Sequence, residues 1–550
     1  MSFNVSIFQM KPILGNIKEN ATKILNHYNK YIDSDIVVTP ELALCGYSPM
    51  DNLYSADFQE EINFYIDSIK NHTKNKNSYL ILGTPWFEDG KIYNVAIVIT
   101  NGEIKDIIYK SKLPNYGVFN EHRYFSKKET NNIISLNNKN IALFVCEDMW
   151  HKDTVDAITA NIDLIISINA SPFEISKEYN KNSSRLKIAQ YACTKLSAPL
   201  IYLNLVGGVD DVIFDGSSFV VDAQGNQIGC LNHAQEDTLT YFLNGELNKE
   251  LANYSNYESN ALIYEAIQLG FKDFLTASGF NGVIIGMSGG IDSTITATMA
   301  VDALGDENVL GISMPSKYTS QLSLDIIDEI RAKLGIKILE IPIDNLVSAY
   351  VKSFPNDLNL KENNVLDNIQ ARIRGQILMA YSNQYKSFMV LTTGNKSEIA
   401  VGYSTIYGDT CGGYNLLKDL YKTSVFEISR WRNKNIPLSS KLQKLNVIPL
   451  EAINRKPSAE LQENQYDEDS LMDYNILDDI LYSIIEKKSS IDEIYKLHNK
   501  DLVNKVVKLL KNSHYKRLQS ATGVNVSIRP FGKDYQYNIS DSFKINNTKS

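Results

Sequence analysis

The chain has 550 residues, a formal net charge of −9 and 43% hydrophobic residues. This length exceeds what one hydrophobic core usually organises, so we expect at least two domains. The acidic balance argues against a nucleic-acid partner, and no apolar run is long enough to span a membrane. The five cysteines contain no CxxC pair, which suits a reducing cytoplasm and disfavours disulfides and a zinc site.

Residues 1–245 alternate short apolar runs with amphipathic stretches. Many strands with intervening helices predict a layered α/β or α+β domain. The strand-like runs are Asn4–Gln9, Ile36–Thr39, Tyr79–Gly83, Val95–Thr100, Ile141–Cys146, Leu164–Asn169, Leu200–Asn204 and Ser218–Asp222.

Residues 246–258 are polar and aperiodic, and we interpret them as a linker before a second domain at 259–550. The second domain begins with a βαβαβ order. This order predicts a doubly wound parallel sheet that binds its ligand at the carboxyl ends of the strands. The predicted elements are helix Ala261–Leu275, strand Val283–Met287, helix Ser293–Leu304, strand Val309–Met314, helix Leu322–Leu334 and strand Lys337–Ile341.

A glycine-rich loop joins the first of these strands to its helix. Its residues are Gly286, Met287, Ser288, Gly289, Gly290, Ile291, Asp292 and Ser293. Glycines bring backbone N–H groups close to an anion, and the helix N-terminus attracts negative charge. Asp292 would repel a phosphate unless a divalent cation lies between them. The lysine of a Walker A loop is absent, which disfavours γ-phosphate transfer.

Glycines alone would indicate no more than a tight turn, but the string SGGxDS resembles the loop of the N-type ATP pyrophosphatases. That family includes the NAD, GMP, asparagine and argininosuccinate synthetases. The further strings, in chain order, resemble those of the NAD synthetases. They are DNIQARIR from Asp367, LTTGNKSE from Leu391, GYSTIYGD from Gly402, LYKT from Leu420, KPSAEL from Lys456 and YKR from Tyr515.

This resemblance implies a Rossmann-like domain that binds ATP and Mg²⁺. It assigns the ATP phosphates to Gly286–Ser293, further ATP contacts to Thr393, Lys422 and Ser458, and Mg²⁺ to Asp292 and Glu398. It also assigns deamido-NAD (nicotinate adenine dinucleotide) to Asn368, Arg372, Glu398 and Lys516. Taken alone, Lys422 and Lys516 would be interpreted as solvated surface charges, and only their place in the strings suggests a binding role.

In the N-terminal part, three chemically suited residues follow strand-like runs. Glu41 follows Ile36–Val38, Lys112 lies beyond Tyr109, and Cys146 ends an apolar run. A buried structural thiol is the default interpretation of a single cysteine. Beside a base and an ammonium, however, a thiol can be a nucleophile that ionises more readily. Glu41 would take the thiol proton, and Lys112 would stabilise an oxyanion.

The order, spacing and flanks of Glu41, Lys112 and Cys146 resemble those of the nitrilase superfamily. The resemblance implies an αββα sandwich that acts as an amidase. It makes Glu121 a second glutamate that helps to position the substrate, and it assigns glutamine contacts to Tyr116, Ser171 and Lys177. The two resemblances together imply a glutamine-dependent NAD synthetase in which the amidase supplies ammonia to the synthetase.

Other functions are compatible with parts of the sequence. One is a plain nitrilase-type hydrolase with a regulatory C-terminal half, which the intact SGGxDS loop disfavours. Another is a nucleotide sensor without chemistry, which the joint presence of Glu41, Lys112, Cys146 and Asp292 disfavours. A third is amidation of another carboxylate or carbonyl acceptor, such as XMP. Resemblance alone implies a homo-oligomer.

Overall fold

The computed structural model describes residues 3–175, 183–249, 258–355, 359–360, 362, 364–463 and 465–540. The chain forms two compact units, residues 1–262 and 263–550. The division falls within helix α6 (Ser259–Ala277). Most of the linker predicted at 246–258 lies outside the described residues, and so does Lys177.

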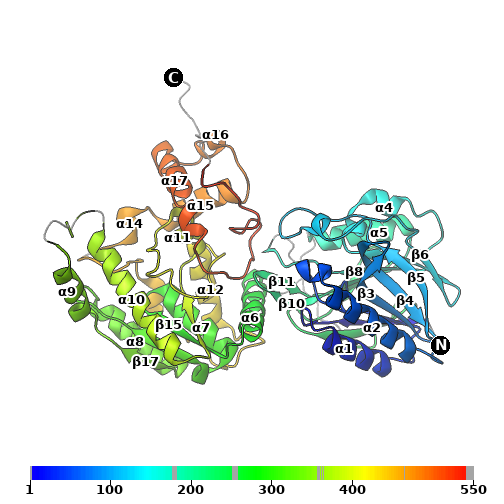
Figure 1. Ribbon diagram of the computed structural model, residues 1–550. Helices are drawn as coiled ribbons and strands as arrows, with labels where there is room; N and C mark the ends of the chain where they lie inside the picture. The colour runs from blue at the N-terminus through cyan, green and yellow to red at the C-terminus, as the bar shows by residue number, and fades with distance from the viewer. Residues whose placement is uncertain are drawn as a thin grey trace. The chain divides into compact units, whose positions relative to one another are not determined.

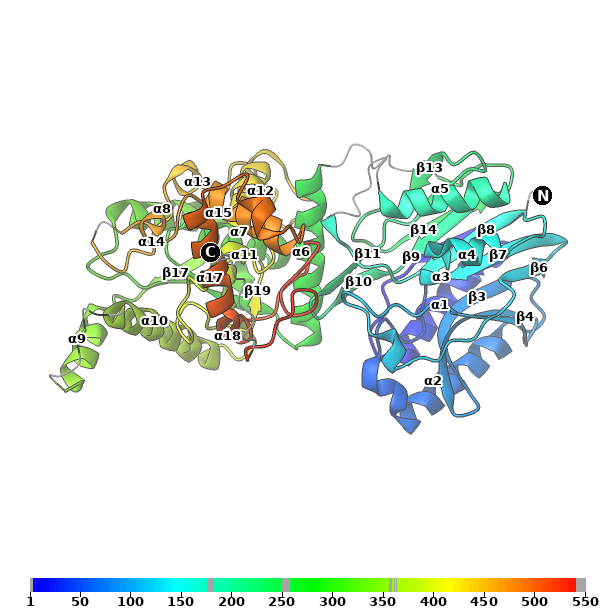
Figure 2. The ribbon, with the colours of Figure 1, turned by 90° about the horizontal axis from the view of Figure 1, so that it is seen from above.

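The first unit contains two six-stranded mixed sheets, with strand orders β14-β1-β2-β3-β4-β5 and β13-β12-β9-β8-β7-β6. Helices α1 and α2 cover one outer face, and α5 covers the other (Figures 1 and 2). The strands are β1 (Asn4–Gln9), β2 (Ile36–Val38), β3 (Tyr79–Glu88), β4 (Lys91–Thr100), β5 (Glu103–Tyr109), β6 (Ile133–Leu136), β7 (Lys139–Val145), β8 (Leu164–Asn169), β9 (Leu200–Asn204), β10 (Val206–Val209), β11 (Val212–Asp215), β12 (Phe219–Val221), β13 (Gln227–Cys230) and β14 (Asp237–Phe242). The helices before α6 are α1 (Ile17–Lys30), α2 (Ala56–His72), α3 (Glu147–Trp150), α4 (Lys152–Asp156) and α5 (Ser184–Leu196).

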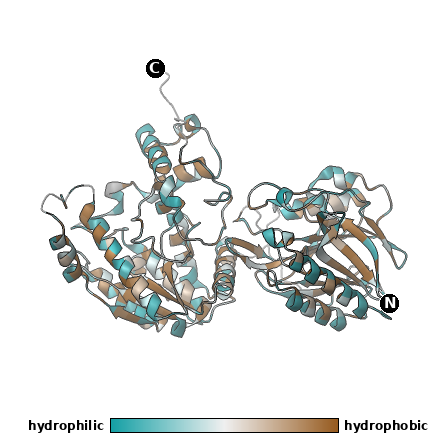
Figure 3. Cartoon of the chain, viewed as in Figure 1, coloured by the Kyte–Doolittle hydropathy of each residue, from teal (hydrophilic) through white to brown (hydrophobic). Residues whose placement is uncertain are grey.

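The alternation of apolar residues along each strand explains the layers of this unit. In β3, Leu80 and Leu82 pack in one core with α1 and α2. Ile81, between them, packs in a second core with Leu143 and Ile166 of the other sheet. Side chains of a strand alternate between its two faces, so a strand that is apolar at successive positions is buried on both sides. The strands are accordingly hydrophobic in Figure 3, and the αββα sandwich is confirmed.

The second unit is built on a five-stranded parallel sheet, in the order β17-β16-β15-β18-β19. Its strands are β15 (Gly282–Met287), β16 (Val309–Ser313), β17 (Lys337–Glu340), β18 (Phe388–Thr392) and β19 (Tyr414–Asn415). Its helices after α6 are α7 (Ile291–Leu304), α8 (Gln321–Leu334), α9 (Asp344–Ser353), α10 (Val365–Gln384), α11 (Lys396–Val401), α12 (Lys422–Lys434), α13 (Leu450–Asn454), α14 (Asp467–Ser470), α15 (Tyr474–Ile485), α16 (Ile491–Ile494), α17 (Lys500–Asn512) and α18 (His514–Arg517).

The strand order places the topological switch point of this sheet between β15 and β18. From β15 the chain runs outward to β16 and β17, and it then returns on the other side at β18. Loops at the carboxyl ends of these two central strands diverge, and the crevice between them is where open α/β sheets bind ligands. The predicted βαβαβ order from residue 261 is therefore confirmed. Among the described residues, no helix is long and apolar enough to cross a membrane.

Candidate active sites

Cys146 occupies the turn between β7 and α3 in the first unit. Its backbone adopts φ 48°, a value that non-glycine residues rarely adopt and that recurs at functional sites. Its N–H donates to the Ile168 carbonyl at 2.9 Å, and the residue is 3% exposed. The β7–β8 pairing therefore fixes the cysteine at the carboxyl end of a buried strand.

A buried lysine bridges two buried glutamates near this thiol. Lys110 Nζ donates to Glu41 Oε1 and to Glu121 Oε1, each at 2.7 Å. Burial lowers the pKa of Lys110, but the charges of Glu121 and Glu41 outweigh it and hold the pKa well above the usual range. Burial raises the pKa of Glu121 to about 7, although Lys110 opposes the shift. The three residues are at most 2% exposed, so their charges act in a weakly screened environment.

The lysine that contacts Glu41 is Lys110. The prediction that Lys112 is the lysine beside Glu41 is therefore wrong by two residues. Lys112 Nζ instead donates to Asp153 at 2.7 Å, in a partly exposed ion pair. The reason lies at the end of β5, where Lys110 still donates its backbone N–H to Asn94 of β4. The strand geometry therefore turns Lys110 inward, and Lys112 lies two residues beyond in the loop.

The thiol is also less acidic than the sequence suggested. Burial and the Glu41 carboxylate raise the pKa of Cys146 well above its usual value, and Lys110 only partly offsets them. Burial therefore favours the neutral thiol over the thiolate. Glu41 is a carboxylate near enough to raise the pKa of this thiol.

Several residues that complete this site were not predicted from the sequence. Asn94 Nδ2 donates to Glu41 Oε1 at 2.7 Å, and Tyr47 Oη donates to Glu121 Oε1 at 2.8 Å. Asp148 accepts from the backbone N–H groups of Ser111 and Lys112 at 3.0 and 2.8 Å. Asp148 thereby ties the segment after Lys110 to the turn of Cys146. Only its closeness to Cys146 in the sequence could have indicated this role.

The predicted glutamine contacts fall into different environments. Tyr116 is 59% exposed, and its hydroxyl donates to Glu147, the residue after Cys146, at 3.0 Å. Ser171 is 4% exposed and directly follows Ala170, whose N–H donates to Glu41 Oε2 at 2.7 Å. Both residues are thus linked to groups beside the thiol, whereas Lys177 lies outside the described residues.

In the second unit, the loop after β15 is closed by its own serines. Ser293 Oγ accepts from the Ser288 N–H at 3.3 Å and donates to the Gly290 carbonyl at 3.0 Å. Gly289 adopts φ +76°, and a Cβ there would lie 2.5 Å from the Ser323 carbonyl oxygen. Only glycine fits this position, which lets the loop wrap closely at the start of α7.

Two carboxylates and a lysine meet beside this loop. Lys422 Nζ donates to Asp292 Oδ2 and, at 3.1 Å, to Glu398 Oε1. Asn395 Nδ2 donates to the other Asp292 oxygen at 3.0 Å. Burial raises the pKa of Glu398 to about 7, opposed by Lys422 and assisted by Asp292. Lys422 is 2% exposed, so the interpretation of it as a solvated surface charge is wrong.

Two adjoining cavities lie at the carboxyl ends of β15 and β18. The first, of about 260 Å³, is lined by Gly286, Met287, Ser288, Thr393 and Ser458, together with Arg374, whose Nε donates to the Met314 carbonyl at 3.1 Å. The second, of about 150 Å³, is lined by Asp292 and Glu398. Ser288 and Thr393 line both cavities, at the ends of β15 and β18. Oxygen donors of this kind suit Mg²⁺ next to a polyphosphate. Arg374, which belongs with Arg372 to the string DNIQARIR, is a further residue of the first cavity.

The remaining predicted residues converge on one segment, Gly402–Ile406. Asn368 Oδ1 accepts from Thr405 Oγ1 at 2.7 Å, and Arg372 Nε donates to the Ile406 carbonyl at 3.3 Å. Lys516 Nζ donates to the carbonyls of Gly402 and Ser404 at 2.8 and 2.6 Å. Residues almost 150 positions apart in the chain therefore surround a segment that borders the second cavity.

Comparison with known proteins assigns each part of the chain to a family. Residues 4–249 match the carbon-nitrogen hydrolase family, and residues 263–520 match the NAD synthase family. The glutamine-dependent NAD(+) synthetase of Aquifex aeolicus is 36% identical, and the alignment covers 98% of this chain and 99% of that protein. The enzyme of the same name from Acinetobacter baylyi is also 36% identical, with 99% of each chain covered. The chain belongs to the glutamine-dependent NAD(+) synthetases.

A solved member of the glutamine-dependent NAD(+) synthetases has the same fold. The enzyme from Acinetobacter baumannii, determined in complex with ADP, is 34% identical and superimposes with a TM-score of 0.76. The alignment covers 99% of this chain and all of that one. Membership of this family makes the chain a ligase that uses ATP and hydrolyses glutamine, and it accounts for a nitrilase-like unit and a synthetase unit in one polypeptide.

Proposed function

We propose that this chain amidates deamido-NAD to NAD, consuming ATP and taking the nitrogen from glutamine. The observation that carries the proposal is that one chain holds two sites, each with charged groups suited to one half of the reaction. The first is a thiol beside the Glu41–Lys110–Glu121 group, and the second is a glycine loop beside the Asp292–Lys422–Glu398 group. The products are NAD, AMP, pyrophosphate and glutamate.

In the amidase site, Glu41 takes the proton of the Cys146 thiol as the sulfur attacks the carboxamide carbon of glutamine. Lys110 stabilises the oxyanion of the tetrahedral intermediate. The C–N bond then breaks, the proton returns to the leaving nitrogen, and ammonia departs from a thioester. Glu41 next activates a water molecule, which attacks the thioester carbon and releases glutamate and the thiol.

The substrate contacts in this site follow from the same neighbourhood. Glu121 keeps one carboxyl oxygen, Oε2, buried and without a hydrogen-bond partner among the described residues. Because an orphaned buried acceptor is costly, we assign this oxygen to the carboxamide of bound glutamine. Tyr116, Ser171 and Lys177 would hold the amino-acid end, with Lys177 facing the carboxylate.

In the synthetase site, a carboxylate oxygen of the nicotinate ring attacks the α-phosphorus of ATP and displaces pyrophosphate. Ammonia then attacks the carboxyl carbon of the adenylated intermediate and displaces AMP, which leaves the carboxamide of NAD. The backbone of Gly286–Ser293 would bind the phosphates, and Thr393, Lys422 and Ser458 would contact ATP. Asn368, Arg372, Glu398 and Lys516 would surround the dinucleotide.

Asp292 and Glu398 would hold Mg²⁺. Their oxygens share the second cavity with Ser288 and Thr393, and at present they share the ammonium of Lys422. The bound cation would neutralise charge on the polyphosphate. Lys422 would then be free to turn toward the phosphates, which accounts for a buried lysine at this position.

Two further statements rest on family resemblance and composition. We propose that the protein acts in the cytoplasm and that it assembles as a homo-oligomer. Light scattering of the purified chain at several concentrations tests the second statement, since a single monomeric mass at every concentration contradicts it.

The decisive test is mass analysis of the products formed from ATP, deamido-NAD and glutamine labelled with ¹⁵N in the side-chain amide. We expect NAD heavier by one mass unit, with AMP and glutamate in equal amounts. A parallel reaction with XMP in place of deamido-NAD tests the alternative acceptor. Release of AMP without labelled NAD, or amidation of XMP alone, would overturn the proposal.

A further inference from the structure

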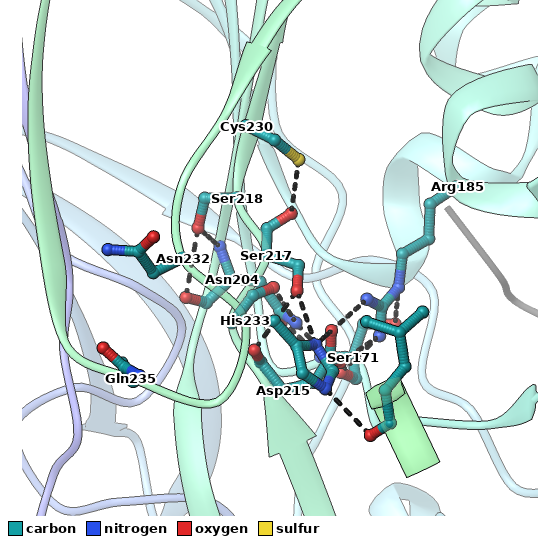
Figure 4. Close-up of polar contacts among 12 residues, drawn as sticks. Ser171, Arg185, Asn204, Asp215, Ser217, Ser218, Cys230, Asn232, His233 and Gln235 are labelled. Carbon is teal, nitrogen blue, oxygen red and sulfur yellow. Dashed lines mark hydrogen bonds and ion pairs between the residues drawn. The ribbon is translucent and has the colours of Figure 1, made fainter. Parts of the chain in front are cut away.

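A buried ionic network lies behind the turn that follows β8. Arg185, in the first turn of α5, is 1% exposed and forms a two-pronged ion pair with Asp215 at the end of β11. Its Nη1 donates to Asp215 Oδ2 at 3.2 Å, and its Nη2 donates to Asp215 Oδ1 at 3.0 Å. Figure 4 shows this pair with His233 beside it. The reaction sequence proposed above uses none of these three residues.

The guanidinium also holds the turn itself. Nη2 donates to the carbonyls of Ser171 and Pro172 at 2.8 and 2.9 Å, and Nε donates to Ser171 Oγ at 3.2 Å. The planar guanidinium thus satisfies three acceptors of the turn and a carboxylate at once, which a lysine ammonium could not do. Asn204 adds a second clamp, because its side chain accepts from the Ser171 N–H at 2.8 Å and donates to its carbonyl at 3.1 Å.

The turn held in this way is part of the amidase site. Ala170, one residue before Ser171, donates its N–H to Glu41 Oε2 at 2.7 Å. Ile168, two residues earlier, accepts from the Cys146 N–H. Arg185 therefore binds one end of the segment 168–172, and the other end of this segment contacts Glu41 and Cys146. A shift of the segment would move the Ser171 hydroxyl first, since that group is bound directly.

His233 supports the network from the far side of Asp215. It is 4% exposed, its Nδ1 lies 3.7 Å from Asp215 Oδ2 and 3.0 Å from Ser217 Oγ, and its ring packs edge-on against Phe173 at 5.7 Å. Its Nε2 lies 3.1 Å from the Leu262 carbonyl, an acceptor, so this nitrogen carries the proton. His233 therefore limits the movement of Asp215 and, through it, of Arg185.

We propose that Arg185, Asp215 and His233 are positioning residues for glutamine hydrolysis, which set the Ser171 turn for binding of the substrate. The inference rests on the proposed function, because it takes Ser171 as a glutamine contact. It assigns a purpose to an arginine that is costly to bury. An uncompensated charge is strongly unfavourable in a protein interior, and here the arginine is matched by one carboxylate and several backbone carbonyls.

Arg185→Lys is the direct test, since it keeps the charge for Asp215 and removes the fork. We expect KM for glutamine to rise about tenfold or more. A change of this size corresponds to the loss of about one to two well-formed hydrogen bonds to the turn. Ammonium-supported synthesis and the rate at which iodoacetamide alkylates Cys146 should stay within about twofold of wild type, as expected for an undisturbed thiol. Lys187→Met, an exposed change in the same helix, is the matched control.

These readouts separate positioning from a merely structural role. Partial unfolding lowers the apparent kcat and raises the alkylation rate, because it exposes the buried thiol, but it leaves KM unchanged. If Arg185→Lys does not fold, His233→Phe decides, because it keeps the ring against Phe173 and removes both nitrogens. Its KM should rise about twofold to threefold, as expected for a contact that acts through Asp215. Unchanged KM in the folded variants overturns the proposal. Cys146→Ala in the same assay separates this failure from failure of the proposed function, which would appear as retained glutamine hydrolysis.

Discussion

The two sites of this chain solve the same problem, the placement of charge beside a reacting group, in opposite ways. In the amidase site the protein supplies every charge, with the ammonium of Lys110 held between Glu41 and Glu121 and all three buried. In the synthetase site two carboxylates, Asp292 and Glu398, line a cavity and share one lysine. That cavity is suited to receive a polyphosphate and its cation.

This difference predicts how substitutions in each site affect folding and activity. In the amidase site Lys110 and its two glutamates are buried before the substrate binds, so loss of one partner leaves an uncompensated charge in the interior. In the synthetase site the side chains of Asp292 and Glu398 are 17% and 16% exposed and line a cavity, so ligands that bring their own charges can change how these groups pair. Changes in the first site should therefore affect both folding and chemistry, whereas changes in the second should mainly affect ligand binding and chemistry.

The largest expected effect separates the two sites completely. Cys146→Ala removes the nucleophile and should reduce glutamine-supported NAD formation by more than about 1,000-fold, since no other group can form the thioester. With ammonium chloride as the nitrogen source, the same variant should remain close to wild type. Both rates are measured by following NAD. If the variant still uses glutamine, the amidase assignment is wrong.

Asp292→Ala should weaken synthesis with either nitrogen source. The change removes one of the two carboxylates proposed to hold Mg²⁺, and we expect a loss of about 100-fold or more, the usual size for a metal-dependent stabilisation of several kcal/mol. Basal glutamine hydrolysis, measured as glutamate, should persist. Ammonium-supported turnover equal to wild type would remove the glycine loop from the mechanism.

The corrected lysine gives a matched pair of variants. Lys110→Met should lower glutamine hydrolysis by about 100-fold, as for loss of an oxyanion donor, and should also destabilise the first unit by about 3 kcal/mol. Lys112→Met removes a partly exposed ion pair with Asp153 and should stay within about twofold of wild type. Rates are taken below the unfolding transition of each variant. The reverse ranking would restore the role to Lys112.

The contrast between the sites also explains what the sequence alone could predict. The synthetase loop is contiguous, and its eight successive residues indicate both a tight turn and an anion-binding site. Its position at the end of β15 was therefore predictable. The amidase group comes from three separate segments. Lys110 and Lys112 lie two residues apart, and which one faces Glu41 depends on where β5 ends. The Arg185–Asp215–His233 network was not predictable, because its members lie on unrelated elements and match no short motif.

The smallest effect concerns acid stability and is specific to the first unit. His27 of α1 is 6% exposed and stacks on Phe8 at 4.4 Å. Burial, assisted by the charge of Lys30, lowers its pKa from 6.5 to about 3. Below pH 6.5 the His27 side chain binds a proton in the unfolded chain but not in the folded chain. The free energy of unfolding therefore falls as the pH drops from about 6.5 toward 3. At pH 5 this contribution is about 2 kcal/mol.

His27→Phe keeps a ring against Phe8 and should remove this contribution to the pH dependence of the free energy of unfolding. His122→Phe, an exposed change, should leave it unchanged. Urea unfolding at pH 7.5 and pH 5, followed by loss of glutamine hydrolysis and separately of ammonium-supported synthesis, measures both units. Equal slopes for wild type and His27→Phe would show that the acid sensitivity does not arise from His27.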